Sequence, residues 1–217
     1  MKIAIMQPYF APYLGYFQLI NEVDKFIFYD DVNYIKGGWI NRNYITVGNN
    51  PYKFTIPLKK SSSFKKINEV EINWGCRDMN KIQKTFYQRF GLHSPSRKII
   101  ENLFNSQPLT IADLAILSIK EISTYLDINT SFKCSSNYII NKTNDKLLNL
   151  VNICNLEKSD TYINPEGGKK LYSKEEFKQH NINLYFIKGT SSKSLLDLID
   201  LYSKEHIINQ LTQYSLI

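Results

Sequence analysis

The stretch "KIAIMQPYFAPYLGYFQLINEVDKFIFYDDV", residues 2–32, decides the fold prediction. It begins with a short apolar run that Pro8 ends, and it closes with a second apolar run over residues 25–32. Between these runs, residues 13–24 carry apolar side chains near helical spacing. A strand, a helix and a second strand of these lengths predict a β-α-β unit with two parallel strands.

The rest of the sequence extends this unit into a single α/β domain over residues 1–217. Residues 43–59 indicate a hairpin around "GNNP", residues 67–74 a further strand, and residues 77–128 a helical insert. Further strands are expected over residues 131–136, 160–164 and 182–187, and further helices over 143–156, 194–203 and 204–214. We therefore predict a Rossmann-like three-layer sandwich with a largely parallel sheet, a small β-hairpin region and the helical insert.

Composition excludes several classes of protein. Of the residues, 43% are apolar, which supplies a core and excludes a disordered chain. No apolar run reaches the roughly 18 residues that span a bilayer, so no membrane insertion is expected. The first residues lack the layout of a signal peptide. These features predict a cytoplasmic protein.

The net charge of +7 suits an anionic partner such as a nucleotide or a membrane surface. The lysines are nevertheless spread along the chain with only short local pairs. This pattern predicts solvated lysine faces and no DNA partner. The three cysteines and three histidines have no metal-like spacing, so no metal is expected.

Polar side chains gather just beyond the two predicted strands of the opening unit. Ligands of open parallel sheets bind beyond the carboxyl ends of the strands. The first loop and helix start supply Gln7, Tyr9, Tyr13 and Tyr16, and the second loop supplies Asp30, Asp31, Lys36, Gly37, Gly38, Trp39, Asn41 and Arg42. If the strands are neighbours, these residues face one cleft, where Gly37 and Gly38 let backbone N–H groups approach an anion.

Simpler structural roles compete with this hypothesis. Tyr13 and Tyr16 also fit ordinary packing of a helix on a sheet, and Asp30 fits a turn cap. Adjacent carboxylates on a strand point to opposite sides, so at most one of Asp30 and Asp31 reaches a ligand from a regular backbone. Arg42 also fits a structural ion pair with Asp30.

A second polar stretch is "YINPEGGKKLYSKEEF", residues 162–177. A strand, an Asn-Pro turn, a Gly-Gly pair and a helix suit a turn that cradles an anion. This makes Asn164, Gly167 and Gly168 candidate binding residues. The sequence carries no nucleophile-elbow serine, no G-x-G-x-x-G and no P-loop.

These motifs resemble the WbqC-like family. The segments "MQPYFAPYLGYFQLINEVDKFIFYDDVNYIKGGWINRN", "YINPEGGKKLYSKEEF" and "LLDLIDLYS" are similar to its signatures in order and spacing. Asp197 and Glu166 depart from the pattern, which has a small hydroxyl residue and an apolar residue at those positions. A weaker likeness links the opening stretch to nucleotidyltransferases with a His-x-Gly-His turn, whose histidines are replaced here by aromatic residues or proline.

The resemblance implies a role in O-antigen or related surface-polysaccharide biosynthesis, as a glycine (aminoacyl) transferase that acts on a nucleotide-linked amino sugar. In that reaction Asp30 or Asp31 would serve as the base for the amine. Lys36, Asn41 or the Gly37 and Gly38 amides would bind the oxyanion. The acyl donor stays open between a carrier-protein thioester, an aminoacyl-tRNA and an adenylate made from ATP. Alternatives are an ATP-dependent amide ligase and a non-catalytic subunit of a glycan assembly complex.

Overall fold

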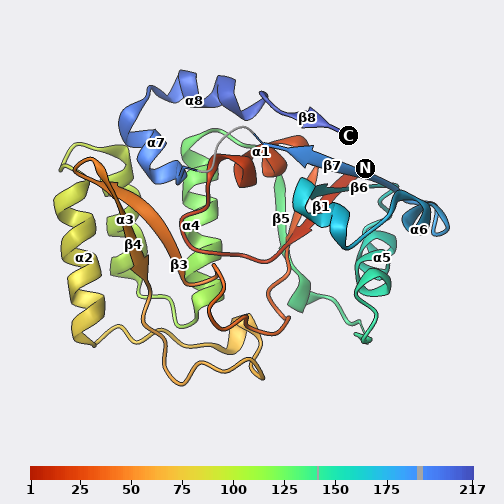
Figure 1. Cartoon of the computed structure of the whole chain (residues 1–217), viewed down its shortest axis with the longest axis horizontal. Coiled ribbons are helices and arrows are strands. Elements are labelled where there is room, and N and C mark those ends of the chain that lie inside the picture. The colour runs from red at the N-terminus through yellow and green to blue at the C-terminus, as the bar shows by residue number, and fades with distance from the viewer. Residues whose placement is uncertain (141, 190–192) are drawn as a thin grey trace.

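The computed structural model describes residues 1–140, 142–189 and 193–217, and its centre is a six-stranded sheet (Figure 1). The strand order is β5-β2-β1-β6-β7-β8, in which the first five strands are parallel and β8 is antiparallel to β7. The strands are β1 (Lys2–Met6), β2 (Lys25–Phe28), β5 (Ser131–Cys134), β6 (Thr161–Pro165), β7 (Asn183–Lys188) and β8 (Ser215–Leu216). The predicted largely parallel sheet is confirmed.

The opening β-α-β unit forms as predicted, with helix α1 (Leu14–Glu22) between the two strands. Strands β1 and β2 pair in parallel from Ile3 opposite Lys25 to Met6 opposite Phe28. Their central residues are 0–3% exposed because helices cover both faces of the sheet. Burial on both faces is why these strands are continuous apolar runs without alternation.

Two helical layers enclose the sheet and complete the three-layer sandwich. Phe26 and Phe28 of β2 pack toward α1 and α4 (Ile111–Tyr125), whereas Ile27 packs toward α5 (Lys146–Leu156) and α6 (Lys174–Lys178). On the second face, the rings of Tyr162 and Phe177 stack with centroids 5.2 Å apart. The change of face after β5 is the doubly wound arrangement of a Rossmann-like sheet.

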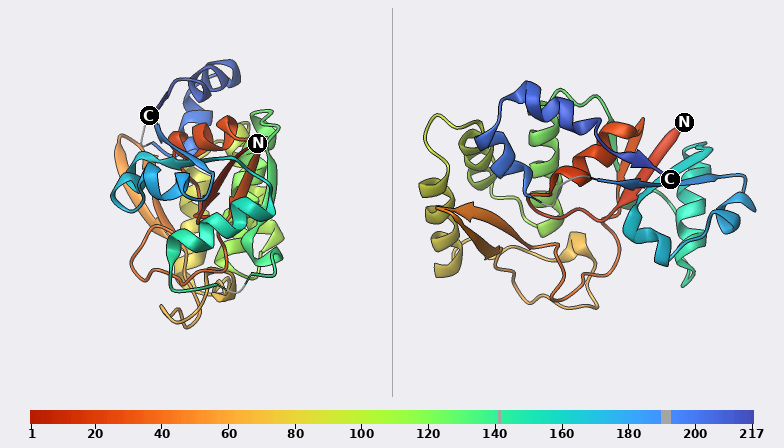
Figure 2. Two further views of the ribbon diagram at one scale, coloured as in Figure 1. Left: turned by 90° about the vertical axis from the view of Figure 1, so that its right-hand side faces the viewer. Right: turned by 45° about the horizontal axis from the view of Figure 1, so that its top comes forward.

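The hairpin and the inserted helices form one end of the molecule, and α5 and α6 form the other (Figures 1 and 2). The hairpin is β3 (Arg42–Val47) with β4 (Asn50–Thr55), and the insert begins with α2 (Arg77–Arg89) and α3 (Pro95–Ser106) and ends with α4. Helices α7 (Leu195–Leu201) and α8 (Lys204–Leu211) follow the sheet. Short 3-10 helices are η1 (Ile67–Glu69), η2 (Ser135–Asn137) and η3 (Glu166–Lys170).

An ion pair ties the hairpin end to α7. Arg89 contacts Asp200 at 2.6 Å and Asp197 at 3.3 Å. Asp197 is 3% exposed and also accepts a 2.8 Å hydrogen bond from the backbone N–H of Thr46 in β3. The Asp197 carboxylate therefore has two structural partners, Arg89 and Thr46.

The strand predicted over residues 67–74 is wrong. This segment contains η1, and its backbone pairs with single residues of two different segments, through isolated bridges of Ile72 with Leu58 and Glu71 with Thr110. Its alternation of apolar residues reflects burial of Val70 and Ile72 against the core. An alternation of apolar and polar residues therefore occurs here in a segment that does not pair continuously with a neighbouring strand.

Glu157, just after α5, joins β2 to β5. Its carboxylate accepts hydrogen bonds from Lys25, from Tyr138 and, at 3.0 Å, from Lys133. Burial alone would raise the pKa of Glu157, but these hydrogen bonds outweigh it and lower the pKa to about 2. The buried carboxylate is therefore held in its ionised form.

Candidate functional site

The sheet has its topological switch point between β1 and β6. From β1 the chain moves to β2 and β5 on one side, and from β6 it moves to β7 on the other. A crevice beyond the carboxyl ends at such a point is the usual ligand site of an open α/β sheet. Gln7 follows β1, Asp30 and Asp31 follow β2, and Asn164 lies near the end of β6. The candidate site is therefore this edge of the sheet.

The first two loops lie side by side. The backbone N–H of Phe10 donates to the carbonyl of Ile40 at 3.1 Å, and the Asn43 side chain donates to the carbonyl of Ala11 at 2.6 Å. On the other side, Leu195 donates its backbone N–H to Pro12 at 2.9 Å. Residues 7–13 are thus clasped between the second loop and the start of α7.

The predicted tyrosines divide into buried and accessible members. Tyr16 is 1% exposed and its hydroxyl donates to the carbonyl of Gln7 at 3.1 Å, so it has the packing role that was the simpler alternative. Tyr9 packs edge-on against Tyr16, with ring centroids 5.1 Å apart. Tyr13 is half-buried and lies over Gly15, where a Cβ atom would stand 2.5 Å from its ring. A side chain at residue 15 would therefore displace the Tyr13 ring from this position.

Asp30 is a structural carboxylate. It is 4% exposed, and it accepts from the Ser136 N–H at 3.0 Å, the Ser136 hydroxyl at 2.7 Å and the Asn68 amide at 3.2 Å. The Ser135 hydroxyl, at 3.0 Å, is a further donor whose single proton Asp30 shares with Asp31. Four donors occupy the acceptor positions of a carboxylate. Asp30 therefore joins the ends of β2 and β5 to η1 and has little capacity left for a ligand.

Asp31 faces a different environment. Its carboxylate pairs with the ammonium of Lys142 and accepts from the Ser135 hydroxyl. Burial would raise the pKa of Asp31, but the hydrogen bonds from Lys142 and Ser135 prevail and lower it. The side chains of Asp31 and Lys142 are 14% and 23% exposed, so the pair borders solvent.

Two tyrosines complete this group. The Lys142 ammonium lies 4.4 Å from the ring centroid of Tyr29, and burial, with the nearby negative charge of Asp31, raises the pKa of Tyr29 to about 12. Tyr172 is close enough to Tyr29 to influence its ionisation. We call Tyr29, Asp31, Lys142 and Tyr172 the edge cluster. Half-buried groups with shifted pKa values, here Asp31 and Tyr29, are typical of functional sites when they lie at a ligand-binding edge.

Asn164 borders the edge cluster through η3. Tyr172 donates its backbone N–H to Gly168 at 3.1 Å, and a Cβ atom on Gly168 would lie 2.2 Å from the Asn164 amide nitrogen. Gly168 therefore gives Asn164 the room it occupies, while Gly167 is exposed with open space around it. Asn164 is 6% exposed at the switch point.

The second loop separates its predicted residues. Lys36, Gly37 and Trp39 are exposed, and Gly37 has a φ of 83°, which favours glycine. Gly38 is half-buried and its N–H donates to Ile35 at 2.9 Å.

The last two predicted residues of this loop differ in their partners. Asn41 is buried and its side chain is engaged, accepting from Tyr34 at 2.8 Å and donating to Ile56 at 2.8 Å. Arg42 is half-buried, and its Nε is buried without a partner among the described residues. The alternative of an Arg42 pair with Asp30 is not realised, because Asp30 is satisfied by Ser135, Ser136 and Asn68.

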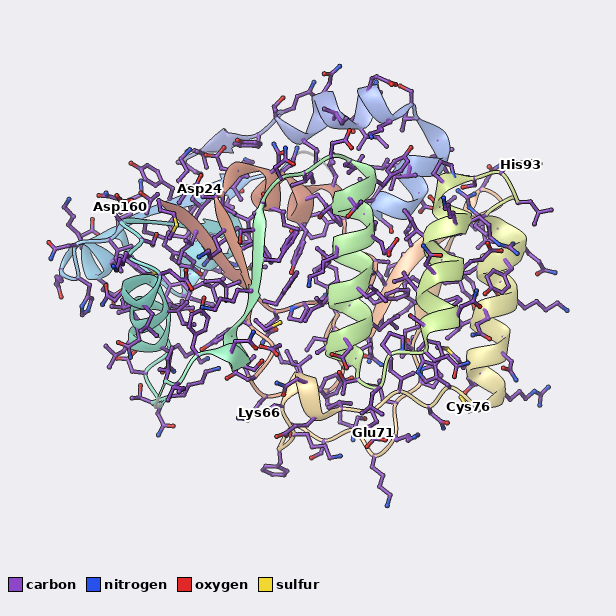
Figure 3. The ribbon with its side chains drawn as sticks, turned by 180° about the vertical axis from the view of Figure 1, so that it is seen from behind. Asp24, Lys66, Glu71, Cys76, His93 and Asp160 are labelled. Atoms are coloured by element: carbon purple, nitrogen blue, oxygen red, sulfur yellow. The ribbon has the colours of Figure 1, made fainter. Side chains whose placement is uncertain are left out.

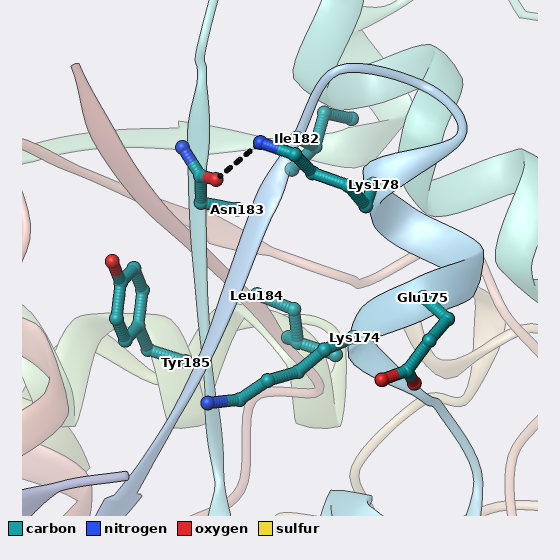
Figure 4. Close-up of a pocket in the computed structure, with 7 residues that line it drawn as sticks. All are labelled: Lys174, Glu175, Lys178, Ile182, Asn183, Leu184 and Tyr185. Carbon is teal, nitrogen blue, oxygen red and sulfur yellow. Dashed lines mark hydrogen bonds between the residues drawn. The ribbon is translucent and has the colours of Figure 1, made fainter.

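Two surface hollows lie elsewhere. One, of about 290 Å³, lies between α6 and the amino-terminal half of β7, where Lys178 donates to Asn183 at 3.4 Å (Figure 4). The other, of about 400 Å³, is bordered by the β3–β4 turn, α2 and Leu201. Neither hollow is lined by a predicted site residue.

Within residues 1–140, 142–189 and 193–217, no three His, Cys, Asp or Glu side chains are grouped to hold a metal ion.

The sequence matches known proteins over most of its length. The model of the WbqC-like protein family matches residues 7–194, a span that includes both loops, the edge cluster and Asn164. The chain belongs to the WbqC-like protein family. The uncharacterized protein Rv1507c of Mycobacterium tuberculosis is 26% identical over 187 residues, which is 84% of this chain and 80% of that protein. No solved structure matches significantly.

In this WbqC-like protein, three members of the edge cluster were not predicted from the sequence: Tyr29, Lys142 and Tyr172. Tyr29 and Asp31 are two residues apart on an extended segment, so alternation already placed them on one face. The alternation therefore made Tyr29 predictable as a neighbour of Asp31. Lys142 and Tyr172 lie in connecting segments after β5 and β6, and their convergence depends on the strand order.

Proposed function

We propose that this protein is an aminoacyl transferase, with glycyl as the favoured group, that acylates the amine of a nucleotide-linked amino sugar in O-antigen or related surface-glycan biosynthesis. The observation that carries the proposal is the Asp31–Lys142 pair beside Tyr29, at the carboxyl edge of the sheet. Membership of the WbqC-like family is consistent with an enzyme at this edge. The resemblance stated above supplies the reaction class.

Asp31 is the anionic partner of the substrate amine. A carboxylate of lowered pKa stays ionised at neutral pH, so it attracts an ammonium group and accepts its proton only briefly. The incoming ammonium displaces Lys142 from Asp31 and loses its proton to the carboxylate. The amine nitrogen then attacks the acyl carbon and the bond to the donor breaks. The second proton of the nitrogen passes to the leaving group, and the proton held by Asp31 is released to solvent.

Lys142 is the second group of this mechanism. Once displaced from Asp31, its ammonium can stabilise the negative charge on the acyl oxygen. Asn41, considered for this role from the sequence, has both ends of its side chain engaged. Arg42 has a guanidinium without an ion pair among the described residues, so we assign it to a substrate phosphate.

Thermal shift separates the candidate reactions. A ligand at about 100 times its dissociation constant adds roughly 2.7 kcal/mol, and a chain of this size gains about 2–4 °C per kcal/mol. A transferase gives a rise of roughly 5–11 °C with a nucleotide-linked amino sugar. A rise with ATP and glycine, and none with the sugar, favours the ligase.

Lys142→Met tests the role of the edge cluster, and Lys133→Met is its matched control. Lys133 likewise pairs with a carboxylate, Glu157 at 3.0 Å, and lies 4.0 Å from a tyrosine ring centroid, that of Tyr138. We expect Lys142→Met to abolish acyl transfer, measured by mass spectrometry of the sugar, and Lys133→Met to retain it. Equal activity of the two variants would refute the assignment and favour the non-catalytic subunit.

A further inference from the structure

The second loop and the segment before η1 form a protruding tip that combines lysines with exposed apolar side chains. We call residues 33–39 and 59–66 the lysine-rich tip. Tyr34 donates its backbone N–H to Lys65 at 2.8 Å, and Asn33 bridges Lys66 in antiparallel fashion. These two contacts hold the segments side by side, so that they form one tip.

Large apolar side chains of this tip are open to solvent. Phe64 is 93% exposed, Trp39 is 57% exposed and Ile35 is 54% exposed. Single exposed apolar residues need no explanation, but a group on one projecting loop pair marks an interaction surface. The aromatic surface continues to Tyr44 of β3, whose ring centroid lies 6.0 Å from that of Trp39.

The charge of the tip has one sign. Residues 59–66 contain four lysines and residues 33–39 contain Lys36, with no Asp or Glu in either segment. Two glutamates border the tip: Glu71 pairs with Lys59 at 3.3 Å, and Glu69 accepts a 2.9 Å hydrogen bond from the backbone N–H of Lys66. The lysines are spread along the whole sequence, so this local group was not predicted from it. The group forms because the two segments pair in the structure.

The tip lies at the same end of the sheet as the edge cluster. Asn68 donates its backbone N–H to Asp30 at 3.1 Å, and Ile67 donates to Val32 at 2.9 Å. Figure 3 shows Lys66 on the lower rim of the molecule and Asp24, which precedes β2, at the opposite end of the strands. The tip therefore projects past the carboxyl edge.

We propose that the lysine-rich tip docks the protein on an anionic lipid surface. Lysine side chains are attracted to acidic headgroups at roughly 1 kcal/mol each, while Phe64, Ile35 and Trp39 enter the interfacial region. Docking of this kind needs no spanning helix, and none of the described helices is long and apolar enough to cross a bilayer. The docked protein presents its candidate site to the membrane surface.

The side-chain types favour lipid over nucleic acid. Every cation of the tip is lysine, which attracts headgroups as a point charge, whereas nucleic-acid sites favour the planar guanidinium of arginine. Ile35 has no flat face for a base, but it fits an acyl-chain boundary. Docking is independent of the chemistry at the edge cluster, so failure of one proposal leaves the other standing.

Co-sedimentation with vesicles tests the proposal. The full chain is mixed with vesicles of phosphatidylcholine alone and of phosphatidylcholine with phosphatidylglycerol, at low and high salt. We expect binding only to the anionic vesicles, and weaker binding at high salt. Replacing Lys60, Lys65 and Lys66 by serine should weaken partitioning roughly 100-fold, since each lysine contributes about fivefold.

Phe64→Ser with Ile35→Ser should weaken partitioning at least about tenfold. The matched control is Leu92→Ser with Lys81→Ser and Lys84→Ser, which removes exposed side chains of the same kinds at the α2 end; Leu92 is 77% exposed. The control should bind like the parent, and every variant should melt near the parent temperature.

Four results would overturn the proposal. They are no sedimentation with anionic vesicles, equal sedimentation with neutral ones, equal loss in the control variant, and tighter binding to a transfer RNA that depends on the same residues.

Discussion

Adjacent carboxylates at the end of β2 should respond in opposite ways to removal. Asp30→Ala takes away the acceptor of four hydrogen bonds and leaves the Ser136 N–H without its partner. Hydrogen bonds to a charged group contribute about 1.5–3 kcal/mol each but do not add. Since Ser136 is exposed and can turn to water, we expect a net loss of about 2–3 kcal/mol.

Asp31→Ala should cost less stability. Its ion pair with Lys142 is partly exposed, a setting in which pairs contribute about 1 kcal/mol or less. Ser135 keeps Asp30 as an acceptor at 3.0 Å. Asp31→Ala should instead remove the rise in melting temperature given by the nucleotide-linked amino sugar.

Differential scanning fluorimetry and urea unfolding measure both variants. At about 2–4 °C per kcal/mol, Asp30→Ala should melt roughly 4–12 °C below the parent and Asp31→Ala at most about 4 °C below it. The urea midpoint should fall with an unchanged slope if the native fold is kept. Equal losses, or a larger loss for Asp31→Ala, would refute the division into a structural and a functional carboxylate.

Three further results are expected. The pKa of Glu157 is lowered to about 2, so the stability that its ionised form contributes is complete above its ordinary pKa of 4.5 and is lost as the pH falls toward 2. The melting temperature of Glu157→Gln, measured against pH, should therefore fall less than that of the parent between pH 4.5 and pH 2. Gly168→Ala should displace Asn164 and weaken sugar binding at least about tenfold in calorimetry, whereas Gly167→Ala, with open space around it, should bind normally. Arg89→Met leaves two carboxylates of α7 without their cation, so urea unfolding should show a loss of about 3 kcal/mol; a loss below 1 kcal/mol would count against that ion pair.

The parallel sheet was predictable because its strands are buried on both faces. Residues 2–6 and 25–28 are short apolar runs followed by a proline and by a carboxylate pair, and they are too short for buried helices. The segment after Lys66 has comparable alternation but only isolated bridges. The periodicity of apolar residues indicates which side chains are buried. Strand pairing also depends on a neighbouring segment, which cannot be identified from the local sequence.

The candidate site was predictable only where it lies next to the opening strands. The first and second loops could be placed together from the β-α-β unit, and Phe10 does bond to Ile40. The roles of Asp30 and Asp31 could not be separated, because most of their donors, Ser135, Ser136 and Lys142, are more than 100 residues away. Such partners follow from strand order.

The clasp on residues 7–13 has a consequence for biogenesis. One of its sides comes from Ile40, and the other comes from Leu195, which is translated much later. Long-range contacts of this kind form slowly, and synthesis proceeds from the amino terminus. Residues 7–13 must therefore wait for the synthesis of Leu195 before this part of the site takes its final shape.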